Sequence, residues 1–98
     1  MYRHPVKTFR WNQENNGDLK RDRGVSFEDV VLAMDSGGLL DVVEHPNRRR
    51  YPKQAGFVVV VAGYVYLVPF VEEADYIFLK TIIPSRKATR DYGIRGVP

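Results

Sequence analysis

The 98-residue chain contains no cysteine. This absence excludes a disulfide framework, a thiolate metal site and a cysteine nucleophile, and it favours a reducing compartment because small secreted domains often need disulfides. The longest apolar run, residues 57–62, is too short for a transmembrane helix, and residues 1–5 lack the apolar stretch of a signal peptide. We therefore expect a cytoplasmic protein with no membrane partner.

Motifs of metal, nucleotide and hydrolase chemistry are also missing from the sequence. His4, His45 and the scattered carboxylates do not have the spacing of metal ligands. Gly37 and Gly38 are not part of a phosphate-binding loop, and no G-x-S-x-G nucleophile motif occurs. We expect neither a metal nor a cofactor.

Positive charge is present, and it is clustered. The net charge is +3, from 15 basic and 12 acidic residues. Residues 46–53 carry +4 and residues 81–98 carry +3, whereas residues 26–45 carry −5. Clustered cations attract polyanions such as RNA, although a basic surface that serves only solubility is the alternative.

Two helices are expected in the first half of the chain. Asn12 is suited to cap a helix over residues 13–22, and Gly24 is suited to the left-handed position after it. Ser26 can cap the second helix, which is the clearest element. Its apolar side chains follow the spacing of one buried helical face: Phe27, Val30, Val31 and Met34.

The rest of the chain is predicted to be mainly strands: residues 8–11, 39–44, 57–62, 64–71 and 76–83. Pro69 predicts an edge, a bulge or a local break in its strand, and Ser85 can cap a short helix over residues 86–92. We expect one domain over residues 1–98, with a core at about 8–92 and short flexible termini. The fold class is α+β: a strand, two helices, a three- to four-stranded antiparallel sheet and a short C-terminal helix, with the helices on one face.

Three sequence motifs resemble a known family. Residues 9–12 read Phe-Arg-Trp-Asn, residues 24–28 read Gly-Val-Ser-Phe-Glu, and residues 86–90 read Arg-Lys-Ala-Thr-Arg. They resemble the W-N start, the G-[IV]-S-F-E helix start and the closing R-[RK]-A-[TS]-[RK] helix of the BrnT toxins. The resemblance spans most of the chain, in the same order of elements.

The resemblance implies a RelE-like fold and a toxin of a bacterial toxin–antitoxin pair that cleaves RNA without a metal. It also implies a partner antitoxin, typically a ribbon–helix–helix DNA-binding protein, so direct DNA binding by this chain alone is not expected. The chain departs from the family's common residues at Asn15, Gly56 and Pro84. These departures favour the alternative, a non-catalytic module of the same fold that binds a protein or RNA.

Metal-free RNA cleavage uses the neighbouring 2′-hydroxyl as nucleophile and needs a proton acceptor, a proton donor and cations. Arg86 and Arg90 lie four residues apart on one face of the expected helix, so they are candidates for the scissile phosphate; a solvated basic helix is the alternative. Glu44, His45 and Lys80 are the candidates for proton transfer, although a histidine beside a proline is more often a turn residue. The candidates for RNA binding are Arg23, Arg48, Arg49, Arg50, Tyr51, Lys53 and Lys87.

Overall fold

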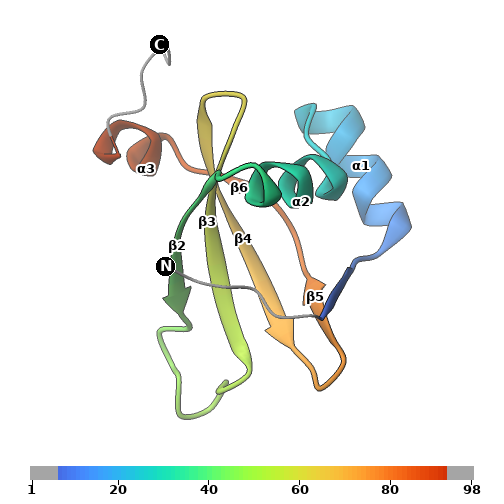
Figure 1. Cartoon of the computed structure of the whole chain (residues 1–98), viewed down its shortest axis with the longest axis vertical. Coiled ribbons are helices and arrows are strands. Elements are labelled where there is room, and N and C mark those ends of the chain that lie inside the picture. Colours follow the sequence, from blue (N-terminus) through green and yellow to red (C-terminus); the bar gives the residue numbers. More distant parts are fainter. Residues whose placement is uncertain (1–6, 93–98) are drawn as a thin grey trace.

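The computed structural model describes residues 7–92, so the expected flexibility of the extreme termini lies outside the described residues. The fold is α+β (Figure 1). Its elements are β1 (Thr8–Arg10), α1 (Gln13–Arg23), α2 (Phe27–Asp35), β2 (Leu39–Glu44), β3 (Gln54–Val61), β4 (Tyr64–Glu72), β5 (Tyr76–Leu79), β6 (Ile83–Pro84) and α3 (Arg86–Asp91). No helix within residues 7–92 has the length and apolar character needed to cross a bilayer.

The sheet is mixed, so the expectation of a fully antiparallel sheet with three or four strands is wrong. Six strands form one sheet in the order β1-β5-β4-β3-β2, with β6 paired to β4. β1 runs parallel to β5, and Phe9 lies opposite Ile77. The periodicity of a three-residue strand does not tell which distant strand it joins, and here the first strand joins the fifth.

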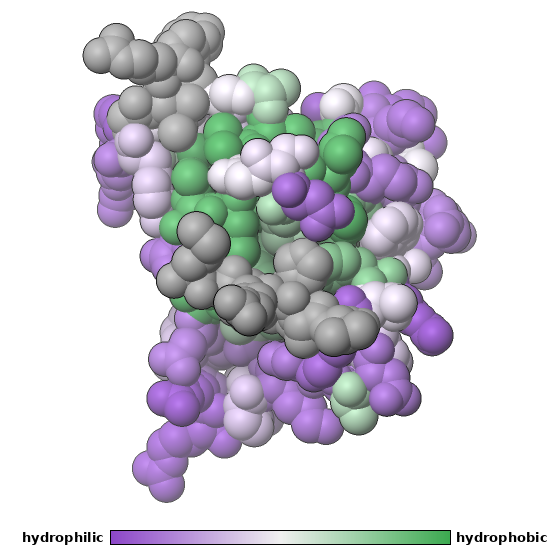
Figure 2. Space-filling model, viewed as in Figure 1, coloured by the Kyte–Doolittle hydropathy of each residue, from purple (hydrophilic) through white to green (hydrophobic). Residues whose placement is uncertain are grey.

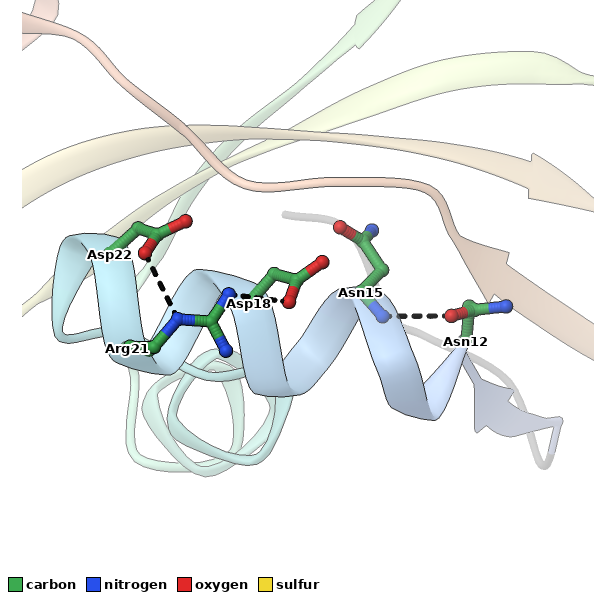
Figure 3. A network of polar contacts seen from close by, with 5 residues as sticks. All are labelled: Asn12, Asn15, Asp18, Arg21 and Asp22. Carbon is green, nitrogen blue, oxygen red and sulfur yellow. Dashed lines mark hydrogen bonds and ion pairs between the residues drawn. The ribbon is translucent and has the colours of Figure 1, made fainter.

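Caps begin and end the helices as the sequence predicts. The Asn12 carboxamide oxygen accepts a hydrogen bond from the backbone N–H of Asn15 at 2.8 Å (Figure 3). Gly24 ends α1 in the left-handed region at φ 70°. Ser26 and Asp29 form a capping box at the start of α2, with reciprocal hydrogen bonds of 2.9 and 3.1 Å.

The apolar face of α2 packs against one face of the sheet, here called the first face. Phe27 and Val30 are fully buried and Met34 is nearly so, as predicted, whereas Val31 is only half-buried. Trp11 stacks on Phe27 with ring centroids 5.6 Å apart. The buried core of this face comprises Leu19, Val25, Phe27, Val30, Met34, Phe57, Val59, Val68, Phe70, Ile77, Leu79 and Ile82. Figure 2 shows hydrophobic residues gathered around α2 and hydrophilic residues over α1.

The predicted strand over residues 76–83 is split into β5 and β6, and Pro69 lies beside the split. The backbone N–H of Lys80 donates to the carbonyl oxygen of Pro69 at 2.8 Å. Since the N and C=O of a strand residue point to the same side, the imide nitrogen of Pro69 faces residues 80–82, between the two strands. The break predicted in the strand of Pro69 does not occur, since β4 runs unbroken from Tyr64 to Glu72; the interruption lies instead in the neighbouring strand, between β5 and β6.

The opposite side of the sheet, here called the second face, has its own buried residues and its own helix. Val58 and Val65 are buried outside the core of the first face. The backbone N–H of Val65 bonds to Thr89 of α3 at 2.9 Å, and the Tyr92 hydroxyl donates to Asp41 of β2 at 3.5 Å. Strand alternation puts Asp41 and Val65 on the second face, so the expectation that all helices cover one face is wrong.

Candidate functional site

The second face contains a hollow of about 140 Å³, lined by β2, β3, β4 and the turn after β2. The residues around it are Val43, Glu44, His45, Pro46, Ala55, Gly56, Leu67 and Pro69. The surface of the hollow is almost entirely apolar, and its Val43 side chain is 38% exposed. An apolar hollow with a few polar groups at its rim is the usual form of a small ligand site.

Gly56 makes the floor of the hollow. A Cβ atom at this position would lie 2.8 Å from Leu67 Cδ1 and 3.5 Å from Val43 Cγ2. The space between these two side chains therefore exists because residue 56 has no side chain. The sequence marks Gly56 only as a departure from the family's common residue; its place in the hollow follows from the pairing of β3 with β2 and β4.

His45 stands at the rim with one ring nitrogen already bonded. Its Nδ1 accepts a hydrogen bond from the backbone N–H of Asn47 at 2.9 Å. In the neutral imidazole the proton is therefore on Nε2, which makes Nε2 a donor. The ring of Tyr51 contacts the imidazole with centroids 4.6 Å apart. Together these contacts hold the His45 ring in one orientation.

The residues after β2, 45–53, form the basic turn, and most of its cations already have a partner. Arg48 forms an ion pair with Glu44 at 3.1 Å, and the guanidinium of Arg50 lies 5.5 Å from the centroid of the Tyr51 ring. Lys53 lies 3.7 Å from Glu73. Arg49 is exposed and has no ion pair within residues 7–92, so it is the cation of this turn that is most available to a ligand.

The basic residues of α3 lie at the other end of the β3–β4 hairpin (Figure 1). Arg86, Lys87 and Arg90 are exposed, and Arg90 lies 3.9 Å from Asp91. Helix α3 begins beside Val65, opposite Val60, whereas Glu44 pairs with Ala55. The five residues from Ala55 to Val60 correspond to about 17 Å of strand. Arg86, at the start of α3, therefore does not meet Glu44 and His45 at one phosphate.

Lys80 lies beside Pro69, just after the end of β5. It follows Leu79, the last residue of that strand, and its backbone N–H bonds to the Pro69 carbonyl oxygen, while its side chain is exposed. Two residues of α1 hold this segment. Asn15 Nδ2 donates to the Lys80 carbonyl oxygen at 2.9 Å, and Arg23 donates to the Ile82 carbonyl oxygen at 2.7 Å. Asn15 points toward this segment in Figure 3.

Arg23 thus has a structural contact that its charge alone did not predict. The sequence also gave no sign that Thr89 joins α3 to the sheet, or that Tyr92 reaches β2. Partial burial and the carboxylate of Asp41 raise the pKa of Tyr92, so its phenol stays protonated and donates. A polar residue within a short basic motif is a weak signal for such contacts, because its partner lies far away in the sequence.

No group of histidine and acidic residues with the arrangement of a metal site occurs within the described part of the chain. Comparison of the chain with models of protein families, with curated proteins and with solved structures gives no match.

Proposed function

We propose that this protein is a metal-independent endoribonuclease, the toxin of a toxin–antitoxin pair with a RelE-like fold, and that RNA lies across its second face. The observation that carries the proposal is the arrangement around the hollow. The basic turn begins at His45 and Pro46 in the wall of the hollow, Lys80 bonds through its backbone to Pro69 of the same wall, and the exposed cations of α3 lie farther along the second face. A surface that binds RNA needs both cations and apolar area, because the phosphates bind cations and the bases stack on apolar side chains.

The chemistry is best assigned to the basic turn. Cleavage by the 2′-hydroxyl needs a proton donor, a proton acceptor and a cation within a few ångströms of one phosphate. As the imidazolium, His45 can give a proton to the leaving 5′-oxygen and return to the neutral form in which Nδ1 accepts from Asn47, and Arg49 can bind the phosphoryl oxygens. Glu44 pairs with Ala55 of the first face and with Arg48, so its carboxylate would have to turn toward the phosphate to accept the 2′-hydroxyl proton. In this scheme Arg86 and Arg90 of α3 bind a flanking phosphate of the same RNA.

A non-catalytic RNA-binding module is the second candidate. The start of α3 lies about 17 Å along the strands from the Glu44–His45 pair, which favours this candidate, because Arg86 then has no proton-transfer group beside it. Binding needs only the charge and the apolar surface, whereas cleavage needs their convergence with His45 and Glu44.

Incubation of the purified protein with single-stranded RNA in the presence of a chelator tests both candidates. The toxin proposal expects products with 2′,3′-cyclic phosphate and 5′-hydroxyl ends. We expect His45→Gln to reduce cleavage by on the order of a hundredfold with little change in RNA affinity. Arg86→Ala is expected to weaken affinity and lower its salt dependence.

Lys20→Ala is the matched control, since it removes an exposed cation from α1. Binding without cleavage by the wild type supports the second candidate, and no RNA binding contradicts both. Expression with and without the adjacent gene tests the antitoxin partner, because the toxin proposal expects growth arrest only when that gene is absent.

A further inference from the structure

We propose that the hollow of the second face binds the base of one nucleotide of the RNA, while the surrounding cations bind the phosphates on either side. This inference rests on the proposed function, since it specifies how the same face holds its RNA. The inference adds a site for a single base, built around Gly56. The charge of this surface by itself predicts only nonspecific binding of phosphates.

The size and the walls of the hollow suit one flat ring. A volume of about 140 Å³ is below that of sites for whole drug-sized ligands, so it takes a fragment such as one base. Val43 and Leu67 stand on either side of Gly56, and the Pro69 ring closes another side. Apolar side chains of this kind stack on the face of any base.

His45 adds a polar contact at the end of the hollow. With Nδ1 bonded to the backbone of Asn47, its Nε2–H is the donor left for a ligand. Each nucleobase carries ring nitrogen or carbonyl acceptors on its edge, so a base in the hollow can accept this hydrogen bond. Because one Nε2–H serves one acceptor at a time, this bond belongs to the bound RNA before cleavage, and the base is held by its apolar contacts while His45 acts on the phosphate.

Charge distinguishes a nucleotide from an apolar protein segment as the occupant. The wall of the hollow continues into the basic turn, which carries Arg49, and Lys80 bonds through its backbone N–H to Pro69 of the wall; both side chains are exposed, and neither forms an ion pair within residues 7–92. An apolar side chain would fill the hollow but would make no interaction with these exposed cations, which would stay hydrated. A nucleotide fills the hollow and supplies the anion as well.

Nuclear magnetic resonance titration with nucleoside monophosphates tests the base site directly, with ribose 5-phosphate as the matched ligand that lacks a base. We expect the amide signals of Gly56 and Leu67 to shift with at least one nucleoside monophosphate and not with ribose 5-phosphate. Equal shifts with both ligands, or shifts confined to the amides of α3, would overturn the base site.

Variants that fill the hollow provide the second test, with a short single-stranded RNA and the same backbone lacking bases as probes. Gly56→Ala places a methyl group against the flexible end of Leu67, and Val43→Phe fills the hollow from its exposed edge. We expect both to lower affinity for the RNA about tenfold, the usual contribution of one stacked base, and to leave binding of the base-free backbone unchanged.

Ala74→Leu, in the exposed turn between β4 and β5, is the control for added apolar bulk, and circular dichroism checks that each variant is folded. If the wild type binds both probes equally, the base site is wrong and RNA binding stands. If it binds neither probe, the proposed function fails together with the base site. If a folded Val43→Phe variant keeps full RNA affinity, the base does not enter the hollow.

Discussion

Thr89 of α3 bonds to the backbone of Val65 in β4, 24 residues away in the sequence. Its hydroxyl oxygen accepts the Val65 N–H at 2.9 Å and donates its proton to the Ser85 carbonyl oxygen at 2.8 Å. Thr89 is only 4% exposed, so both bonds are shielded from water. This side chain joins a six-residue helix, too short to be stable by itself, to the edge of the sheet.

We therefore predict that Thr89→Val destabilises the protein by about 1–3 kcal/mol, because the buried Val65 N–H loses its acceptor while the side-chain volume is kept. Urea unfolding measures the difference. Thr8→Val, at an exposed position of β1, is the matched control and should change the free energy of unfolding little. Equal effects of the two substitutions would show that α3 does not depend on this bond.

Phe27 is predicted to be the main apolar contact between α2 and the sheet. It is fully buried and stacks on Trp11, so Phe27→Ala should cost about 3–5 kcal/mol through lost burial and a cavity. Leu32→Ala on the outer side of the same helix, where Leu32 is 67% exposed, should stay within about 0.5 kcal/mol. Fluorescence of Trp11, the only tryptophan, follows the unfolding. A Phe27→Ala variant as stable as Leu32→Ala would contradict this packing.

The contact between Glu28 and Asn16 predicts a pH dependence of stability. The Asn16 amide donates to Glu28 at 2.7 Å, and this bond lowers the pKa of Glu28 below its ordinary 4.5. A lowered folded-state pKa means that the charged form stabilises the fold above the ordinary pKa. This contribution is lost as pH falls through the lowered value.

The wild type should therefore exceed Glu28→Gln in stability at about pH 7, and the difference should shrink at about pH 3. Chemical unfolding at both pH values measures it, with Glu14→Gln in the first turn of α1 as the control. A difference that stays constant between the two pH values would mean that the charge of Glu28 is not what the contact stabilises.

Arg23 is predicted to act on stability more than on RNA. Its hydrogen bond to the Ile82 carbonyl oxygen holds the segment after Lys80, so Arg23→Ala should cost about 1 kcal/mol at this partly exposed position. Arg21→Ala removes the same charge from an ion pair with Asp18 on the surface of α1, and should cost less. Melting temperature and RNA affinity are measured for both. A larger loss of RNA affinity in Arg23→Ala than in Arg21→Ala, without a difference in stability, would contradict the prediction and show that Arg23 contacts the RNA.

The sequence by itself determined the elements whose causes are local. Asn12 and Ser26 cap helices through bonds to residues three positions away, and the spacing of Phe27, Val30 and Met34 sets the buried side of α2. Ala62 and Gly63, both at positive φ, close the hairpin that the apolar strands on either side predict. Such signals are readable because the interacting groups lie within a few residues of one another.

Only the tertiary structure decided which distant segments meet. The parallel pairing of β1 with β5, the crossing of α3 over the second face and the hollow at Gly56 all depend on how the strands stack into one sheet. The same packing set the start of α3 about 17 Å along the hairpin from the end of β2, although Arg86 and Glu44 were both catalytic candidates. Charge and residue type show what a side chain can do, whereas the burial of apolar surface over the whole chain fixes what lies beside it.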